Sequence, residues 1–226
     1  MGALLRGNVV FLHIPKTGGS WVRHVLRKQG LVKMEFPDTH PEMNRLHHFP
    51  RFYPLHFAKQ SIKYRSTKLA REVRKSYKFC FVRHPHDWYE SYWRYMKGRK
   101  WQIDEAPNGF LDSTWKPNTI LQDYGGDGFR QFMEGVLANH PGYLSQMYGW
   151  YSPPGEIDFV GRTESLVDDL LEALETAGID VDEEAVRNTE KVNTSPRQID
   201  RPEWDEDLRD AVRRLEAPAF ERFGYE

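Results

Sequence analysis

The stretch "FLHIPKTGGSW" (residues 11–21) joins an apolar run to a helical pattern through a turn that holds a proline and two glycines. The run that leads into it, "NVVFLHI" (residues 8–14), is short and rich in β-branched and aromatic residues, which is typical of a buried strand. The apolar residues after the turn recur at helical spacing, at Trp21, Val22, Val25 and Leu26. The stretch therefore predicts a strand, a tight turn and a helix in direct succession, and Gly30 is a suitable residue to end that helix.

Such a turn is suited to binding phosphate. The first N–H groups of a helix have no partner inside the helix, and together with the helix dipole they favour an anion at that end. Gly18 and Gly19 allow the main chain to approach phosphate oxygens without a Cβ in the way. Lys16 adds a mobile cation, and Thr17 and Ser20 add hydroxyl groups. We therefore expect a P-loop-like phosphate-binding turn.

The order of the residues in this turn differs from that of a nucleoside triphosphate site. The Walker A loop reads G-x-x-x-x-G-K-[ST], with the lysine after the second glycine. Here Lys16 precedes Gly18, and no glycine precedes the lysine at the required distance. No apolar strand that ends in aspartate stands out as a magnesium-binding partner. The order disfavours a P-loop kinase or NTPase, which we keep as the alternative enzyme class.

A second motif, "FCFVRHPHDWYESYW" (residues 79–93), follows another strand pattern. Arg83 comes where this strand should end, Pro85 predicts a turn, and Ser91 falls near the first turns of the next helix. A bidentate guanidinium and a nearby hydroxyl can hold one phosphate group between them. The pair therefore indicates a second phosphate-binding position.

The remaining patterns indicate the fold class. Further strands are expected at residues 31–36, 77–83 and 157–162, and further helices at residues 88–97, 129–140, 142–151 and 165–178. Strands separated by helices are typical of a parallel sheet that is covered on both faces. The sequence predicts a three-layer α/β fold with a central parallel sheet, as one domain spanning residues 1–226.

The composition indicates the cellular compartment in which the protein functions. A single cysteine, Cys80, rules out a disulfide framework and suits a reducing compartment. The longest apolar run is far too short to span a bilayer, and Arg6 stands where a myristoylation signal has serine or threonine. We expect a soluble, cytoplasmic protein that does not bind a membrane.

The charges are unevenly distributed although the net charge is only -1. Residues 1–155 hold 23 Lys and Arg against 12 Asp and Glu, whereas residues 156–226 hold 9 against 21. The basic part contains both phosphate motifs and fits an anionic ligand. Because the domain as a whole is not basic, nucleic acid is not expected as a partner. No residues have the spacing of metal ligands, so we expect no metal.

Four segments in order resemble motifs of the sulfotransferases that use 3′-phosphoadenosine 5′-phosphosulfate (PAPS). "HIPKTGGS" resembles the 5′-phosphosulfate loop of the carbohydrate branch, whose relatives include the heparan sulfate 2-O-sulfotransferases. "FVRHPHDWYES" resembles the 3′-phosphate motif, "DFVGRTESL" a later strand segment, and "KVNTS" a Val-Asn-x-Ser stretch. The resemblance implies transfer of a sulfuryl group from PAPS to an acceptor hydroxyl, with adenosine 3′,5′-bisphosphate as the product.

The resemblance also implies roles for individual residues. Lys16 would contact the 5′-phosphosulfate and stabilise the charge that grows on the bridging oxygen as the S–O bond breaks. Arg83 and Ser91 would hold the 3′-phosphate. The other nucleotide-binding candidates are Thr17, Gly18, Gly19, Ser20 and Trp21 around the 5′-phosphate, with Arg162, Asn193 and Ser195 near the nucleotide. Trp21 departs from the family pattern, in which a smaller residue is frequent.

Sulfuryl transfer to a hydroxyl needs a base, and histidine is the natural one near neutral pH. His40, in "PDTHPE", lies where the family tends to place a catalytic histidine, and His56, in "PLHFAK", is the second candidate. Glu35 and Asp38 are carboxylate alternatives, either as bases or as groups that orient His40.

The acceptor leaves no short motif. Many Trp and Tyr residues could stack on sugar rings, although such residues more often pack in a core. The eight Lys and Arg residues in residues 59–78 could meet an acidic glycan or form a solvated helix face. A carbohydrate and a small hydroxylated metabolite both remain candidate acceptors. A third hypothesis is a non-catalytic module that binds the nucleotide or a glycan.

Overall fold

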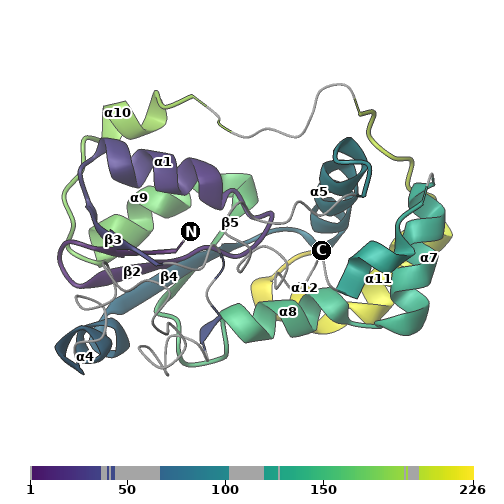
Figure 1. Ribbon diagram of the computed structural model, residues 1–226, viewed down its shortest axis with the longest axis horizontal. Coiled ribbons are helices and arrows are strands. Elements are labelled where there is room, and N and C mark those ends of the chain that lie inside the picture. The colour runs from purple at the N-terminus through teal and green to yellow at the C-terminus, as the bar shows by residue number, and fades with distance from the viewer. Residues whose placement is uncertain are drawn as a thin grey trace. The chain divides into compact units, whose positions relative to one another are not determined.

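The computed structural model describes residues 2–36, 40, 42–43, 67–101, 120–126, 128–190, 192 and 199–226 (Figure 1). It divides into two compact units, each built from two stretches of the chain. The first unit comprises Met1–Val82 and Gly149–Val192, and the second comprises Arg83–Tyr148 and Asn193–Glu226.

The first unit contains a five-stranded sheet in the order β3-β1-β2-β4-β5. Its strands are β1 (Ala3–Leu5), β2 (Val9–Leu12), β3 (Val32–Glu35), β4 (Tyr77–Val82) and β5 (Phe159–Arg162). β4 pairs in parallel with both β2 and β5, whereas β1 pairs antiparallel with β2 and β3. The α/β class and all four expected strands are confirmed, and β2, β4 and β5 form the expected parallel core of the sheet. The sheet as a whole is mixed, because the additional strand β1 runs antiparallel to β2 and β3.

β1 escaped the sequence pattern because it is short and is joined to β2 by a hairpin rather than by a helix. Gly7 and Asn8 in the connecting turn have φ values of 73° and 61°. This left-handed backbone is the conformation that glycine and asparagine adopt most readily and that tight hairpins require. The "GN" pair at residues 7–8 was the available signal.

The helices of the first unit are α1 (Gly19–Lys28), α4 (Thr67–Lys75), α9 (Leu166–Thr176) and α10 (Glu183–Arg187), with the 3-10 turn η3 (Thr163–Ser165). Figure 1 shows α1 and α9 on one side of the sheet and α4 on the other. α1 ends as expected, since Gly30 has a φ of 64° just beyond its last turn.

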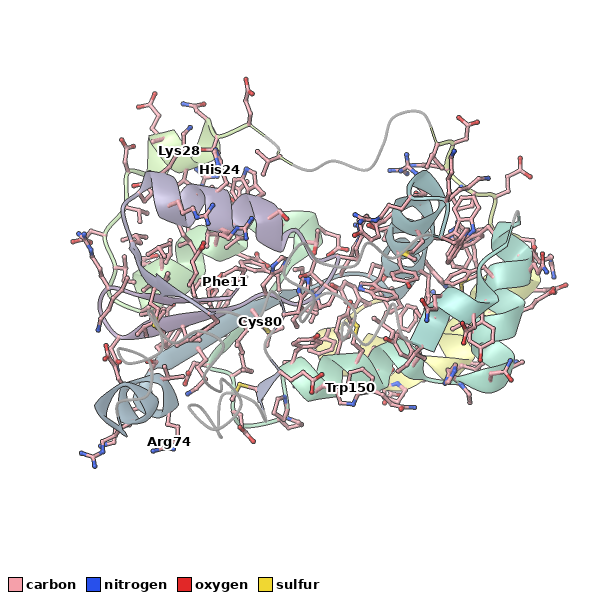
Figure 2. All side chains as sticks on the ribbon, viewed as in Figure 1. Phe11, His24, Lys28, Arg74, Cys80 and Trp150 are labelled. Atoms are coloured by element: carbon pink, nitrogen blue, oxygen red, sulfur yellow. The ribbon has the colours of Figure 1, made fainter. Side chains whose placement is uncertain are left out.

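The core of the first unit lies between the sheet and the pair α1 and α9. Phe11 of β2 is 1% exposed and packs with Phe79 and Phe81 of β4. In Figure 2, Phe11 lies beneath α1, while His24 and Lys28 lie on the outer side of that helix. This packing fixes the end of β2 and the start of α1, between which the glycine turn lies.

The second unit is helical over its described residues. It contains α5 (Pro85–Gly98), η2 (Gln122–Tyr124), α7 (Phe129–Asn139), most of α8 (Tyr143–Tyr151), α11 (Glu206–Leu215) and α12 (Ala217–Phe223). Pro85 is the first residue of α5, so the helix begins three residues earlier than expected from the periodicity. Proline suits this position because its missing N–H would have no helical partner there.

Several of the tyrosines and tryptophans considered for sugar stacking pack inside the second unit. Trp88, Tyr89 and Tyr92 are fully buried in α5, and the rings of Trp88 and Tyr92 stack at 5.4 Å. Trp93 is 4% exposed beside Phe129. The core role, which is the commoner role of such residues, holds for these four.

Candidate functional site

The turn between β2 and α1 has an unusual backbone. Lys16 has a φ of 64° and Gly18 a φ of 79°, so two residues of the turn are left-handed. The N–H groups of Trp21 and Val22 donate to the Gly18 carbonyl, which begins the helix. A left-handed lysine is uncommon and costs free energy, and such residues cluster at functional sites.

The two glycines of the turn also lie where neighbouring side chains leave little space. A Cβ on Gly19 would lie 1.9 Å from Cδ2 of His13, and a Cβ on Gly18 would lie 2.6 Å from Cδ2 of Leu166. The sequence indicated these glycines only as places of close approach to phosphate. The structure adds that the side chains of His13 and Leu166 fill the space where side chains at these positions would lie.

The residues of the turn alternate in exposure. Lys16, Gly18 and Ser20 are partly exposed, whereas Thr17 and Gly19 are buried. The Thr17 hydroxyl donates to the Ile14 carbonyl at 2.9 Å, so its proton is used within the turn. An anion approaching from solvent therefore meets Lys16, Ser20 and the start of α1, whose first turn has no acidic residue.

Trp21 lies in the core of the first unit. It is 5% exposed, and its indole N–H donates to the carbonyl of Thr189 at 3.2 Å. This bond ties the first turn of α1 to the residues just after α10. The large side chain at this position, which departs from the family pattern, thus has a structural partner of its own.

His13 and His40 form a pair at the end of β2. Nδ1 of His40 lies 2.9 Å from the His13 carbonyl, and the ring centroids are 4.4 Å apart. Because a carbonyl only accepts, Nδ1 of His40 carries the proton and Nε2 keeps its lone pair. His40 as a whole residue is partly exposed.

Both histidines are held neutral at physiological pH. The pKa of His40 is lowered to about 3, mainly by burial and to a lesser extent by nearby positive charges that include Lys16, while the bond to the His13 carbonyl acts in the opposite direction. Burial, followed by the neighbouring His40, lowers the pKa of His13 well below its usual value. The structure thus brings the candidate lysine and the first candidate base together in one unit.

Arg83 begins the second unit as the residue that follows β4, and it is partly exposed. Its main-chain N–H donates to the Tyr148 hydroxyl at 3.0 Å, and that hydroxyl donates to the Arg83 carbonyl at 2.7 Å. Ser91 lies in the second turn of α5 and is 5% exposed. No sequence pattern singled out Tyr148.

Arg162 is the last residue of β5, and its side chain is exposed. Its main-chain N–H donates to Oδ2 of Asp169 at 2.5 Å, and the next residue, Thr163, donates its hydroxyl proton to the carbonyl of Val82 at 2.8 Å. Because β2, β4 and β5 are parallel, their carboxyl ends meet at one edge of the sheet. That edge is where open α/β sheets bind their ligands.

The other candidates are less favoured or lie outside the described residues. Glu35 forms an ion pair with Arg27 at 2.6 Å, in which the guanidinium donates to its Oε2. Outside the described residues lie the second candidate base and the carboxylate and loop candidates His56, Asp38, Asn193 and Ser195. Within the described part of the chain, no group of three or more His, Cys, Asp or Glu is arranged to hold a metal ion.

Comparison with known proteins gives one match. A family model described as "Sulfotransferase family" matches residues 6–226, nearly the whole chain. Searches of curated proteins and of solved structures found no match. None of the helices in the described ranges is both long enough and apolar enough to cross a membrane.

Proposed function

Because the chain belongs to the Sulfotransferase family, which consists of PAPS-dependent transferases, we propose that it moves the sulfuryl group of PAPS to the hydroxyl of a carbohydrate or small metabolite. Adenosine 3′,5′-bisphosphate is then the second product. The family model extends over both compact units, which supports the proposal that residues 1–226 act as one catalytic domain.

The observation that carries the proposal is the turn that follows β2. It combines a partly exposed lysine in a left-handed conformation, a helix start without an acidic residue, and a neutral histidine close to the lysine. PAPS supplies the sulfuryl group. Lys16, Ser20 and the N–H groups at the start of α1 would hold its 5′ end, and the lysine would stabilise negative charge on the leaving phosphate.

The 3′-phosphate would be held by Arg83 and Ser91. This group distinguishes PAPS from ordinary adenylates, so the arginine would give the site its selectivity for the donor. A guanidinium can bind a phosphate through two parallel hydrogen bonds, which a lysine cannot do. Arg162, at the carboxyl edge of the sheet, together with Asn193 and Ser195 would complete the nucleotide site.

His40 is our proposed base. Its Nε2 has the lone pair needed to accept the proton of an acceptor hydroxyl, because Nδ1 is committed to the His13 carbonyl. The residue is partly exposed, as a base that meets an incoming acceptor must be. His56 is the competing candidate. His40→Ala should abolish transfer and keep nucleotide binding, and full activity in that variant would assign the role to His56 or another group.

Nucleotide binding tests the proposal first. Adenosine 3′,5′-bisphosphate should raise the melting temperature of the protein, and 5′-AMP at the same concentration should do so much less. Equal shifts would contradict the role of Arg83 and Ser91. A shift by ATP that requires magnesium would favour the P-loop kinase or NTPase alternative instead.

Transfer of labelled sulfate from PAPS to a panel of glycans, phenols and small alcohols then tests catalysis. Lys16→Ala should lower the rate about 100-fold or more, since removing one charge-stabilising group typically has that effect. Lys28→Ala is the matched control, because Lys28 is exposed in the last turn of α1, the helix that follows the phosphate-binding turn, and its replacement should leave the rate unchanged. Nucleotide binding without transfer to any acceptor would favour the non-catalytic module.

A further inference from the structure

We propose that Tyr148 is a positioning residue for recognition of the 3′-phosphate, because its hydroxyl holds both main-chain polar groups of Arg83. The inference rests on the proposed function, which assigns Arg83 to that phosphate. In this role Tyr148 would act through the arginine and not by contacting the nucleotide.

The contacts are specific and lie within the second unit. The Tyr148 hydroxyl accepts from the Arg83 N–H at 3.0 Å and donates to the Arg83 carbonyl at 2.7 Å. Tyr148 is fully buried, and its ring meets that of Phe223 edge-on at 5.4 Å. A buried ring in this setting has little freedom to move its hydroxyl, so the two bonds define one position of the Arg83 main chain.

Arg83 needs such support because of its place in the chain. The register of β4 with β5 ends at Val82, so Arg83 is the first residue beyond the paired segment of the strand. In an antiparallel pair, one residue exchanges both an N–H and a carbonyl bond with its partner. The Tyr148 hydroxyl gives Arg83 the same two bonds from a side chain. A long arginine side chain can then start from a fixed Cα, which lowers the entropy lost when it binds a phosphate.

Helix α8, which carries Tyr148, is itself fixed at its start by a buried carboxylate. Glu216 is fully buried and accepts from the N–H groups of Leu144 and Ser145 at 3.0 and 2.8 Å. It also accepts from the hydroxyl of Tyr89, which lies on α5 two residues before Ser91. The two helices whose residues approach the proposed 3′-phosphate site, α8 through Tyr148 and α5 through Ser91, therefore share one anchor.

Isothermal titration with two ligands separates this role from a general structural one. Wild type, Tyr148→Phe, Arg83→Ala and the double variant are titrated with adenosine 3′,5′-bisphosphate and with 5′-AMP. Tyr148→Phe keeps the ring and removes the hydroxyl, and it should weaken bisphosphate binding about 3- to 10-fold, as expected for hydrogen bonds of ordinary strength. Its affinity for 5′-AMP should not change, because that ligand has no 3′-phosphate.

Tyr124→Phe is the matched control. It removes a tyrosine hydroxyl bond in the same unit, from Tyr124 to Nε2 of His140 at 3.1 Å, and it should leave both affinities unchanged. If Tyr148 acts through Arg83, the double variant should bind the bisphosphate no more weakly than Arg83→Ala alone. Additive losses would overturn the inference, as would an equal loss for both ligands, which a merely structural role predicts.

The inference and the proposed function fail in different ways. A wild-type protein that binds the two nucleotides equally would refute the assigned role of Arg83, and the inference would fall with it. A wild type that prefers the bisphosphate, with Tyr148→Phe showing the same preference, would overturn the inference alone. Hydrogen exchange of the Arg83 amide in the ligand-free wild type adds a test that needs no variant. Exchange should be slowed at this amide, and exchange at the rate of an unprotected peptide would also overturn the inference.

Discussion

Replacing Gly19 by alanine is the sharpest test of how the phosphate-binding turn is built. The added Cβ would lie 1.9 Å from Cδ2 and 2.4 Å from Nε2 of His13, whereas real Cβ atoms essentially never come within 3.0 Å of another heavy atom. His13 is 7% exposed and lies 4.4 Å, ring to ring, from His40, so its ring has little room to retreat. Overpacking of this kind typically costs about 1–3 kcal/mol, and we expect Gly19→Ala near the upper end.

The measurement is the free energy of unfolding by urea at pH 7.5, with the affinity for adenosine 3′,5′-bisphosphate measured alongside. Gly30→Ala is the control, because nothing lies within 4 Å of its Cβ and only its φ of 64° opposes the change. That strain should cost about 1 kcal/mol. His13→Ala in the Gly19→Ala background should recover part of the lost stability by removing the clashing ring. A Gly19→Ala variant as stable as wild type, or no recovery in the double variant, would refute the packing argument.

Three further predictions follow from the contacts and pKa shifts. Burial lowers the pKa of His86 from 6.5 to about 4, so the folded protein favours the neutral ring. The free energy of unfolding should therefore fall as the pH drops from 6.5 towards 4, because the unfolded chain then binds a proton that the folded protein does not. Between pH 7.5 and 5 the loss in the free energy of unfolding amounts to about 2 kcal/mol. In urea unfolding of His86→Asn, the free energy of unfolding should depend less steeply on pH than in wild type, and an equal pH dependence would contradict the lowered pKa of His86. In an NMR titration of the free protein, the His40 ring should stay neutral from pH 8 to 5, since burial lowers its pKa to about 3; a midpoint near 6.5 would show that the pairing with His13 does not form. Trp21→Phe, which loses the bond to the Thr189 carbonyl, should lower the free energy of unfolding by about 1 kcal/mol; no change in a urea melt would show that this bond contributes nothing.

The parts of the fold that the sequence predicted are those with local causes. The succession of β2, turn and α1 follows from a short apolar run, a glycine pair and a helical period within about 20 residues. The same holds for β4 and α5, where Arg83 ends the one and Pro85 begins the other. Local patterns fail at β1, a strand of three residues whose only signal was a Gly-Asn turn.

The parts of the site that the sequence did not predict depend on distant contacts. Tyr148 lies 65 residues from Arg83, and no spacing rule connects a tyrosine in one helix to the main chain at the end of a strand. Thr189 lies 168 residues from Trp21. The packing of His13 against Gly19 is close in sequence, but it depends on the ring orientation, which no residue pattern encodes. Residue types indicate the chemistry of a site, whereas the contacts that hold those residues in place come from tertiary packing.

The position of the lysine ahead of the glycines has a chemical consequence under the proposed function. In the Walker order the lysine follows the last glycine of the loop. Here Lys16 precedes Gly18, and its charge, after the larger effect of burial, lowers the pKa of His40. A phosphosulfate bound at Lys16 would offset that charge, so the pKa of His40 should rise when the donor site is filled. Burial, the larger cause, would remain in the loaded protein, so the bound donor would reverse only the smaller part of the lowering.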